Sequence, residues 1–427
     1  MQSHQPGSVG FGLRIAVVGG SLTGTATALF LAQHGFTDVT VYEASPAAAT
    51  LSGGLLTLDH MVLDRLDRAG IAQHHYVHIP SETIWQVPVR HRQPGRPDGR
   101  RYPGRFTTWT RLAAALSAAA IGWLPPGAIR TGARVTGLTE HSGRPRLHLT
   151  GGGIVSADVV VFADGCASIG RRLLAPQRQL HYAGYVGYRG SIAAAELPCP
   201  APAPPAQVPQ TLAEIAGLGD FWRLQPGDGL QCNVCPVPGG LDWTCYLDTT
   251  DEQLPAIFGA APHQRFFAPG KHISELAHAR LDASVTDRLP FAFAALIHAT
   301  SRRAAFPMLD VDPPARAVWP VGDGWAVLAG DALAPVRAHT GRGANHGLEQ
   351  AAALTAVLGQ YARHGADLGS ALHGWQRRIL PAVLDTLLLG PRLGHRAGLG
   401  ITATASPRPT RGAEPAVAAL PGPAPRK

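Results

Sequence analysis

The stretch Arg14–Glu43, RIAVVGGSLTGTATALFLAQHGFTDVTVYE, decides the fold of this chain. It opens with the apolar run Ile15–Val18 and passes through a glycine turn into Ser21–His34, where the apolar residues have helical spacing. It closes with Val39–Tyr42, whose β-branched residues favour a strand. Two strands joined by a helix form a βαβ unit, and such a unit builds a parallel sheet. The chain is therefore expected to begin with an α/β domain.

The turn in this unit has the pattern of a dinucleotide fingerprint. It reads Gly19, Gly20, Ser21, Leu22, Thr23, Gly24. The fingerprint needs a tight turn, a small residue where the backbone meets a pyrophosphate, and a last glycine where helix packs on strand. Ser21 replaces the usual middle glycine but is still small, and the helix N-terminus still offers free amides to phosphates. An acidic residue that can hold ribose hydroxyls is expected about 20 positions on. Glu43, followed by Ala44, fills that place, so nucleotide binding is favoured over an ordinary strand-to-helix turn.

Length and composition indicate a globular protein of more than one domain. The chain has 427 residues, of which 45% are hydrophobic and 15% charged, with 50 glycines and 37 prolines. This suits two closely packed domains and a turn-rich surface. The net charge of +8 comes from scattered arginines without interleaved aromatic residues, so no nucleic-acid partner is expected.

Neither a membrane nor a metal partner is expected. The longest nearly apolar stretch, Leu112–Leu124, is shorter than the roughly 18 residues that a bilayer requires, and residues Met1–Leu13 do not resemble a secretory signal. A cytoplasmic location is the default. The five cysteines cannot all pair within one chain, and Cys232 with Cys235 lacks the further ligands that a zinc site would need.

The remaining pattern divides the chain into two interleaved parts. Helices are expected at Asp59–Ala69 and at Arg111–Ala120, the second capped by Thr110, and strands alternate with them. Arg92–Gly104 is expected to be a polar loop. From Tyr182 to about Val318 the helical periodicity weakens, which predicts a domain dominated by sheet.

Two further motifs follow apolar strands. The first is Asp164-Gly165, which runs on to Arg171, and the second is Gly330-Asp331. Each alone could be a polar turn, but with the glycine fingerprint, in this order, they resemble the group A flavoprotein monooxygenases, a family of aromatic hydroxylases. The resemblance extends to about residue 395. Within the family, Tyr182–Gly190 looks most like the 2,6-dihydroxypyridine 3-hydroxylases.

The resemblance implies an α/β fold with two interleaved parts. One is a Rossmann-like FAD-binding domain of the para-hydroxybenzoate hydroxylase type, and the other is a mainly antiparallel β-sheet substrate domain. The implied boundaries are residues 12–78, 103–180 and 318–360 for the FAD-binding domain, 79–102 and 181–317 for the substrate domain, 361–399 for C-terminal helices and 400–427 for a flexible tail.

The resemblance also implies a role for each matched position. Glu43 would hold the adenosine ribose, and Arg111 would face the pyrophosphate, as suits a guanidinium at a helix start. Asp331 would bind the ribityl chain, while Asp164 and Arg171 would lie where FAD and the nicotinamide cofactor share a groove. The remaining cofactor contacts would come from the glycine-rich turn that follows, namely Gly341, Gly343, Ala344 and Asn345.

One position departs from the family pattern. The family carries a proline seven residues past the Gly-Asp aspartate, and this chain has Ala338 there, followed by His339. The glycine-rich turn argues that FAD binding is kept, while the missing proline concerns the handling of oxygen. His339 and Arg189 are the catalytic candidates, His339 as a base for a hydroxylated substrate because its reference pKa suits that work.

Other polar and aromatic residues are weaker candidates for substrate contacts, because most of them suit a core or a surface equally well. They are His60, Trp85, Tyr185, Tyr188, Trp222, Trp243 and Tyr246.

The favoured function is a single-component monooxygenase with FAD as cofactor and NAD(P)H and O2 as co-substrates, acting on an aromatic or heteroaromatic small molecule. One alternative is an FAD oxidoreductase that acts on a natural-product intermediate without oxygen insertion. Another is a flavin-binding protein without turnover. The sequence leaves the oligomeric state open, with a homodimer as one option.

Overall fold

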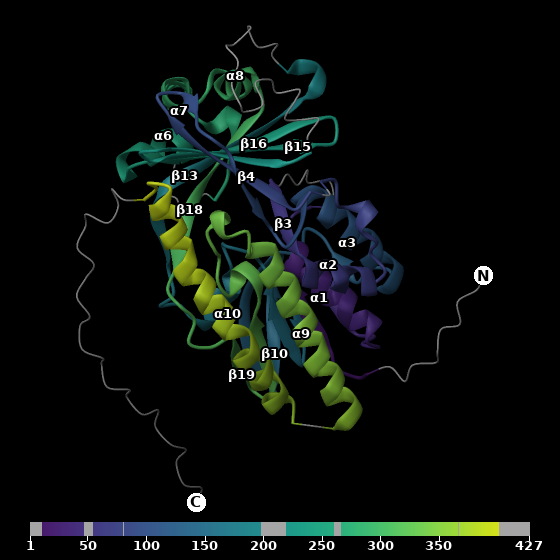
Figure 1. Ribbon diagram of the computed structural model, residues 1–427. Helices are drawn as coiled ribbons and strands as arrows, with labels where there is room; N and C mark the ends of the chain where they lie inside the picture. The colour runs from purple at the N-terminus through teal and green to yellow at the C-terminus, as the bar shows by residue number, and fades with distance from the viewer. Residues whose placement is uncertain are drawn as a thin grey trace, which may run out of the picture.

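The computed structural model describes residues 11–46, 54–79, 81–197, 219–259, 266–365 and 367–400. Two sheets dominate this part of the chain, one of six strands and one of nine. Figure 1 shows the nine-stranded sheet above the six-stranded one, with two long helices, α9 and α10, running down the lower half.

The six-stranded sheet has the order β19-β20-β12-β1-β2-β8. Its strands pair in parallel, except that β19 is antiparallel to β20. Every residue of β1 and β12 is buried, as expected of central parallel strands covered on both faces. The strands are β1 (Ile15–Val18), β2 (Val39–Tyr42), β8 (Ile129–Arg130), β12 (Val159–Phe162), β19 (Val318–Val321) and β20 (Gly324–Leu328).

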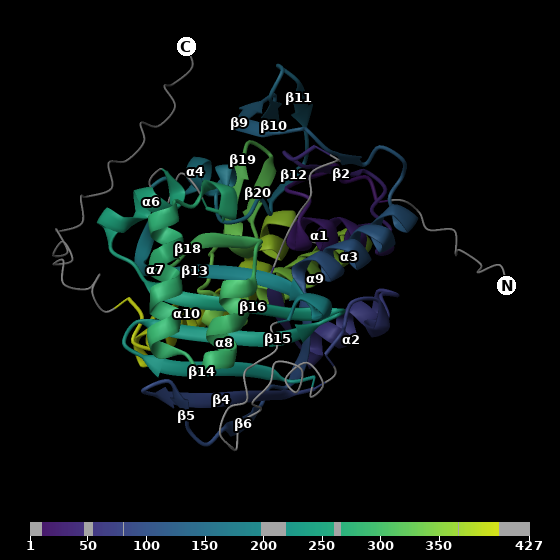
Figure 2. The same cartoon turned by 90° about the horizontal axis from the view of Figure 1, so that it is seen from above.

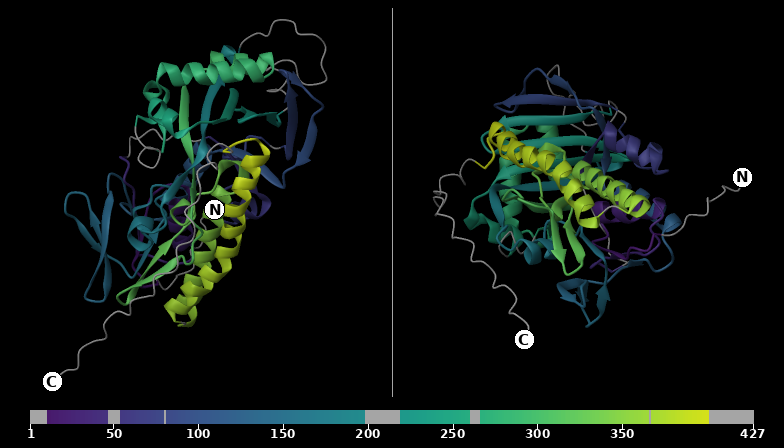
Figure 3. Two further views of the ribbon diagram at one scale, coloured as in Figure 1. Left: turned by 90° about the vertical axis from the view of Figure 1, so that its left-hand side faces the viewer. Right: turned by 90° about the horizontal axis from the view of Figure 1, so that it is seen from below.

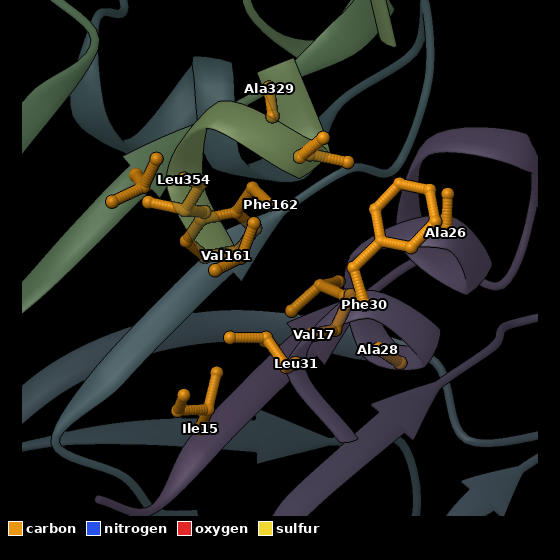
Figure 4. Packing of buried hydrophobic residues seen from close by; sticks show 14 of the residues in the cluster. Ile15, Val17, Ala26, Ala28, Phe30, Leu31, Val161, Phe162, Ala329 and Leu354 are labelled. Carbon is orange, nitrogen blue, oxygen red and sulfur yellow. The ribbon is translucent and has the colours of Figure 1, made fainter. Parts of the chain in front are cut away.

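Four helices pack on this sheet and on one another. They are α1 (Leu22–Gln33), α3 (Trp109–Trp123), α9 (Gly343–His364) and α10 (Leu368–Arg396). Val17 of β1, Phe30 of α1 and Phe162 of β12 belong to one buried cluster, seen in Figure 4. Because α1 packs against both α3 and α9, it is buried on nearly every side, and the sequence of α1 is correspondingly apolar all round. Figure 3 shows α9 and α10 lying side by side along one flank.

The nine-stranded sheet has the order β17-β18-β13-β16-β15-β14-β4-β5, with β6 paired to β4. It is antiparallel except where β14 runs parallel to β4. The strands are β4 (Thr83–Arg90), β5 (Gln93–Pro94), β6 (Asp98–Arg101), β13 (Leu180–Ala193), β14 (Phe221–Gly227), β15 (Leu230–Val237), β16 (Gly240–Asp248), β17 (Ala268–Pro269) and β18 (Arg303–Val311).

One face of the nine-stranded sheet is apolar and carries the helices α6 (Leu254–Phe258), α7 (Glu275–Arg288) and α8 (Phe291–Ala299), visible on top of the strands in Figure 2. Trp243 and Cys245 of β16 pack in the core beneath these helices. Because side chains alternate along a strand, Thr244 and Tyr246 point to the opposite face. That polar face looks toward the six-stranded sheet.

Smaller elements join the two sheets and extend from them. β3 (Leu55–Asp59) pairs with β7 (Gly104–Thr108) and leads into α2 (His60–Arg68). Figure 2 shows β9 (Val135–His141), β10 (Arg144–Leu149) and β11 (Ile154–Ser156) as a separate three-stranded arm. The short helices are η1 (Gln73–His75), α4 (Ile169–Leu174), η2 (Ala194–Glu196), η3 (Asp251–Gln253), η4 (Gly270–His272), η5 (Gly330–Ala332) and η6 (Ala338–Thr340).

The structure corrects several expected elements. α3 begins at Trp109 with Thr108 as its N-cap, so Thr110 lies inside the helix. The expected loop 92–104 contains β5 and β6, because Asp98–Arg101 pairs with β4. α7 and α8 are helices in the part where sheet was expected to dominate. Nearly all of the expected tail, 401–427, lies outside the described residues.

Candidate functional site

The predicted motifs converge because of the direction of the strands. β1, β2, β12 and β20 run parallel, so their carboxyl ends share one edge of the six-stranded sheet. Gly19 follows β1, Glu43 follows β2, Asp164 lies just beyond β12 and Asp331 just beyond β20. Residues that are up to 312 positions apart, from Gly19 to Asp331, therefore lie along one edge.

The glycine turn is tight enough to need its glycines. Gly19 has a φ of +99°, and a Cβ there would lie 2.5 Å from the carbonyl oxygen of Ala163. A Cβ at Gly24 would lie 1.8 Å from the carbonyl oxygen of Gly19. The first and last glycines thus have the turn-forming and packing roles that the fingerprint assigns to them.

The rest of the turn divides between packing and an open helix end. Ser21 is the exposed N-cap of α1, and its side chain makes no capping hydrogen bond. Leu22 is buried, and Thr23 packs against Gly330 and Gly347, where a Cβ would lie 2.5 and 2.1 Å from its Oγ1. The open helix N-terminus suits a phosphate group, whose charge it would stabilise.

Glu43 is bonded to the turn itself. Its Oε2 accepts a hydrogen bond from the Gly20 amide at 2.7 Å, and its Oε1 accepts one from the Ser45 amide at 2.7 Å, across the intervening Ala44. A carboxylate has about four acceptor positions, so two remain for another donor. Contact of Glu43 and Ala44 with a ribose stays a prediction.

Asp164 binds the start of the short helix α4, whose N-cap is Ser168. Its carboxylate accepts from Ser168 Oγ and from the Ile169 amide, each at 2.6 Å. Burial raises the pKa of Asp164, and these hydrogen bonds oppose that shift. Gly165 makes the turn with a φ of +75°. The carboxylate therefore organises the segment from within.

Arg171 joins the two polar motifs. Its Nη1 donates to the carbonyl oxygens of Asp331 and Ala332 at 3.0 and 3.1 Å, and its Nη2 donates to the carbonyl oxygen of Cys166. The residue is only 3% exposed, and burial lowers its pKa. Its place beside a nicotinamide cofactor stays a prediction, while its bonds tie the Asp164 segment to the Asp331 segment.

Asp331 differs from Glu43 and Asp164 because its carboxylate has no hydrogen-bond partner among the described residues. It lines a cavity, and Gly330 before it has a φ of +60°. Surrounding protein atoms raise the pKa of Asp331 to about 6, with Arg171 acting in the opposite direction. A carboxylate that faces a cavity without a protein donor fits a ligand that brings hydroxyl groups.

Arg111 is placed in the first turn of α3. Its Nε is buried and has no hydrogen-bond partner in the described part of the chain, although its positive charge contributes to lowering the pKa of His78. A buried guanidinium donor without an acceptor is costly, so it suits an anionic ligand group. Its contact with a pyrophosphate stays a prediction.

The glycine-rich turn opens the long helix α9. Gly341 has a φ of +63°, and the first amides of the helix, from Gly343 and Ala344, point out of its N-terminus. Asn345 is fully buried, where its Oδ1 accepts from the Asp59 amide at 2.8 Å and its Nδ2 donates to Thr57 and Gly341. Asn345 therefore holds the turn against β3.

A cavity of about 320 Å³ lies where the two sheets meet. The six-stranded domain and its turn contribute Asp331, Gly341 and Gly343, and the polar face of the other sheet contributes the opposite wall. The full lining is Leu55, Leu56, Thr57, Ile84, Tyr102, Phe221, Arg223, Asn233, Thr244, Tyr246, Asp331, Val336, Ala338, His339, Thr340, Gly341, Gly343 and Ala344.

The opposite wall carries a cation among aromatic rings. Arg223 lies over the ring of Phe221 at 5.8 Å, and its Nε donates to Asn233 Oδ1 at 3.4 Å. No carboxylate pairs with Arg223 among the described residues, and burial lowers its pKa. Thr244 and Tyr246 lie on the same face of β16, where Thr244 is paired with Asn233 of β15. This wall suits a flat ring with an acidic substituent.

His339 lines the cavity, but its imidazole is not free. Nε2 lies 2.8 Å from Tyr185 Oη, and Arg337 Nη1 donates to the same oxygen at 3.5 Å. Because an arginine can only donate, Tyr185 accepts from Arg337, and its hydroxyl shares a further hydrogen bond with Nε2. The other ring nitrogen, Nδ1, is buried without a partner in the described residues. Burial, followed by the charges of Arg223 and Arg337, lowers the pKa of His339 to about 3.

Arg189 lies apart from this cavity. Its Nη1 would be 3.1 Å from a Cβ at Gly54, and its guanidinium is over the ring of Phe267 at 5.2 Å. Burial lowers the pKa of Arg189 and raises that of Asp242 to about 7, and the two charges partly offset these shifts. The structure does not bring Arg189 together with His339, and a catalytic role for Arg189 stays a prediction.

The other substrate candidates divide by burial. Only Tyr246 joins His339 in the lining, and Tyr185 lies directly behind His339. Trp85 and Trp222 stack on each other at 5.7 Å, Tyr188 and Trp243 belong to the core under the helices, and His60 pairs with Glu82 near the surface. The two cysteines Cys232 and Cys235 point to opposite faces of β15, as their spacing on a strand requires.

Sequence reasoning missed Arg223, Asn233, Thr244 and Tyr102 in the lining. The signal was present in β15 and β16, where polar residues alternate with buried apolar ones as in Gln231, Asn233 and Asp242, Thr244. Such alternation predicts a sheet with one polar face, and a buried polar face marks a ligand site.

None of the helices in the described ranges is long and apolar enough to cross a membrane. Within the same ranges, no group of three or more His, Cys, Asp or Glu side chains is placed to hold a metal ion.

Comparisons with known proteins agree with this geometry. No protein-family model matches the chain. A 3-amino-4-hydroxybenzoate 2-monooxygenase from Streptomyces platensis is 28% identical over 390 residues, which cover 90% of this chain and 88% of the relative.

Solved structures extend the likeness to the fold. That of 2,6-dihydroxypyridine-3-hydroxylase from Arthrobacter nicotinovorans has a TM-score of 0.74 at 21% identity, covering 91% of this chain and 93% of that one. A Klebsiella pneumoniae protein in complex with FAD and uric acid has a TM-score of 0.67 at 19% identity, covering 90% and 89%. They confirm the expected fold class. The chain is a homologue of the FAD-dependent aromatic hydroxylases and has the fold of the group A flavin monooxygenases.

Proposed function

We propose that the chain is a single-component monooxygenase that uses FAD, NAD(P)H and O2 to hydroxylate an aromatic or heteroaromatic small molecule. The observation that carries this proposal is the cavity between the two sheets. One wall offers the unpartnered carboxylate of Asp331 and the N-terminus of α9, and the other offers Arg223 among aromatic rings. A cofactor on one side and a flat ring on the other would meet there.

The residues present fit FAD. Asp331 would hold the ribityl hydroxyls, Glu43 the adenosine ribose, and Arg111 with the α1 N-terminus the pyrophosphate. The amides of Gly343 and Ala344 would meet the pyrimidine edge of the isoalloxazine, where negative charge collects on reduction. When bound and reduced, FAD supplies the activation of O2 and the transfer of one oxygen atom. The chain supplies position, exclusion of water and electrostatics.

The wall of the nine-stranded sheet sets the substrate class. Tyr246, Phe221 and Tyr102 offer apolar ring faces, and Arg223 offers a cation without a carboxylate partner in the described part. A ring that carries a carboxylate or an ionised hydroxyl would satisfy Arg223. We therefore infer an acidic ring compound as substrate, and an aromatic carboxylate such as the 3-amino-4-hydroxybenzoate of the relative belongs to that class.

A second hollow supports the use of a nicotinamide dinucleotide. It has a volume of about 410 Å³, lies beside the Asp164 segment, and is lined by Arg171, Arg172 and Arg178 without a carboxylate. Arg172 is exposed there, while Arg171 and Arg178 are buried and bonded to backbone carbonyls, so together they would attract the phosphates of NAD(P)H by their charge. The reductant would dock there transiently.

The test begins with the cofactor and ends with the product. Purified protein should release noncovalent FAD on denaturation, and 3-amino-4-hydroxybenzoate, 2,6-dihydroxypyridine and uric acid should be screened for stimulated NADPH and NADH oxidation. Under ¹⁸O2, the product should contain one labelled oxygen. An oxidised product without label would establish the FAD oxidoreductase instead, and bound FAD without NAD(P)H oxidation would establish a non-catalytic flavin protein.

The setting of the reaction follows from its reagents. A cytoplasmic location suits it, because that compartment supplies NAD(P)H and keeps thiols reduced, and the four cysteines within the described residues are all free. The cavity is built from one chain, so a homodimer would not be required for its chemistry.

A further inference from the structure

A chain of polar groups leads from the cavity to the protein surface. Tyr102, which lines the cavity between β6 and β7, donates its hydroxyl hydrogen to Asp59 Oδ1. Asp59 Oδ2 in turn accepts from Arg342 Nη1, and the Asp59 side chain is 18% exposed. A phenol inside the cavity is thus bonded to a carboxylate that water can reach.

The surroundings keep Asp59 in place as an acceptor. Arg342, from the glycine-rich turn, also approaches Glu349 of α9 at 3.3 Å. The neighbouring titratable groups are His60 and Glu82, which bind each other at 3.0 Å, while Arg101 and Arg105 also bind Glu82. Because Arg342 cannot give up its proton, it stays a permanent counter-ion to Asp59.

His339 is poorly suited to remove a proton. Its Nε2 is already hydrogen-bonded to Tyr185 Oη at 2.8 Å, and its Nδ1 is buried without a partner among the described residues. Burial and two arginines hold the pKa of His339 near 3, so it has little affinity for a further proton at neutral pH. The hydroxyl of a bound ring therefore needs another acceptor.

On the basis of the proposed function, we propose that Tyr102 and Asp59 carry the proton of a substrate ring hydroxyl out of the cavity. The substrate O–H bond breaks as its proton moves to Tyr102 Oη, while the phenolic proton of Tyr102 moves to Asp59. Asp59 then releases a proton to water. The net change is one ring hydroxyl converted to an oxyanion and one proton in solution.

Arg223 completes this arrangement. Arg223 has no carboxylate partner among the described residues, so its positive charge can balance the negative charge of the oxyanion formed in the cavity. An ionised hydroxyl pushes electrons into the ring, which favours attack by an electrophilic oxygen. Tyr102 acts as a catalytic residue because it touches the substrate, and Asp59 acts through Tyr102.

The test follows ionisation directly, without turnover. FAD-loaded protein is mixed with 4-nitrophenol in a stopped-flow instrument, and both the nitrophenolate absorbance and proton release to a pH indicator are recorded. We expect Tyr102→Phe and Asp59→Asn each to slow ionisation roughly 100-fold, the scale of a positioned proton transfer. Tyr182→Phe, whose hydroxyl binds Thr249 instead, and Glu82→Gln are matched controls that should ionise the ligand at the wild-type rate.

A second measurement, at higher pH, distinguishes a loss of proton transfer from a structural defect of the variants. At a pH where 4-nitrophenol is ionised before it binds, Tyr102→Phe and Asp59→Asn should bind it at the wild-type rate, because no proton remains to be moved. A defect that persists there would overturn the proposal, as would unslowed ionisation in Tyr102→Phe or no ionisation in the wild type. If 4-nitrophenol ionises through Tyr102 but no ring compound is ever hydroxylated, the proposed function fails and the relay stands.

Discussion

At the scale of single residues, two carboxylates beside the same site have opposite energetic characters. Glu43 is bonded through both oxygens to backbone amides, so it stabilises the glycine turn whether or not a ligand is present. Asp331 has no such partner in the described part of the chain, and desolvation raises its pKa. The raised pKa means that the ionised carboxylate of Asp331 is less favourable in the folded apoprotein than in the unfolded chain, and hydrogen bonds from a ligand would stabilise it.

This difference gives a prediction for Asp331→Asn. We expect FAD affinity to fall about tenfold to a hundredfold, since a hydrogen bond to a charged group is worth roughly 1.5–3 kcal/mol. The apoprotein should instead melt at a higher temperature than wild type at pH 7. Fluorescence titration with FAD and thermal melts of both apoproteins measure the two effects.

The pH dependence determines the sign of the stability difference between Asp331→Asn and wild type. The folded pKa of Asp331, about 6, lies above the unfolded value, so wild-type apoprotein loses stability as the pH rises from about 4 to 6. Below about pH 4 the two melting temperatures should coincide. Asp323→Asn, at an exposed carboxylate on the β19–β20 turn, is the control. Equal melting at every pH would mean that Asp331 is not desolvated.

Ala338 gives a second prediction at this scale. It is the first residue of η6, and Arg337 before it has φ −61° and ψ 136°, the extended conformation that a following proline requires. Ala338→Pro should therefore fold, with a stability gain of about 0.4–1 kcal/mol. If the proline confines the cavity wall, the ratio of hydroxylated product to NADPH consumed should rise and hydrogen peroxide should fall. An unchanged ratio in a folded, FAD-loaded variant would remove Ala338 from the control of oxygen.

Sequence patterns locate residues tied to a turn more readily than residues that depend on strand pairing. Glu43 and Asp331 follow strands of a recognisable motif, so their shared edge was predictable. Arg223 reaches the cavity only because β14 pairs with β15 on one side and turns its polar face inward. On its other side, β14 pairs in parallel with β4. Nothing in the sequence around Arg223 indicates that it pairs with Gln86 of β4, which lies 137 residues earlier in the chain.

At the scale of elements, the helices α7 and α8 show why the second domain was expected to be mostly sheet. α7 buries only Ala277, Leu281 and Val285, which follow one another at intervals of four residues. Its apolar stripe is therefore narrow. α8 is apolar nearly all round, and such a short run can be a strand or a buried helix. Packing on the sheet decided between them, as it does where local preference is weak.

Two glycines in helices give an element-scale prediction with its own control. Gly24 lies in the first turn of α1, where a Cβ would lie 1.8 Å from Gly19 O, so Gly24→Ala should cost about 3 kcal/mol or more and abolish FAD binding. Gly122 lies in the exposed part of α3 with nothing within 4 Å of a Cβ. Gly122→Ala should therefore stabilise the protein by about 0.5–1 kcal/mol. Chemical denaturation measures both, and equal effects would contradict the close approach at Gly24.

At the scale of the whole molecule, the cavity belongs to neither sheet alone. β3 and the glycine-rich turn are held together by Asn345, while the nine-stranded sheet closes the opposite side. A ligand in the cavity must therefore touch both parts of the chain. Substrate and cofactor should stabilise each other because each one completes a wall for the other.

A charged and an uncharged ligand can separate the contribution of the substrate wall from that of the cofactor wall. Arg223 belongs to the substrate wall, so Arg223→Gln should weaken binding of 3-amino-4-hydroxybenzoate about tenfold to a hundredfold, the worth of one charge-assisted hydrogen bond. The uncharged 3-amino-4-hydroxybenzamide should lose little, and FAD affinity should not change, because Arg223 lies on the wall opposite Asp331 and the α9 N-terminus. Perturbation of the flavin absorbance by each ligand measures the affinities. Arg316→Gln, at an exposed arginine over Trp319, serves as the matched control. Equal losses for the acid and the amide would show that Arg223 shapes the wall and does not read the charge of the ring.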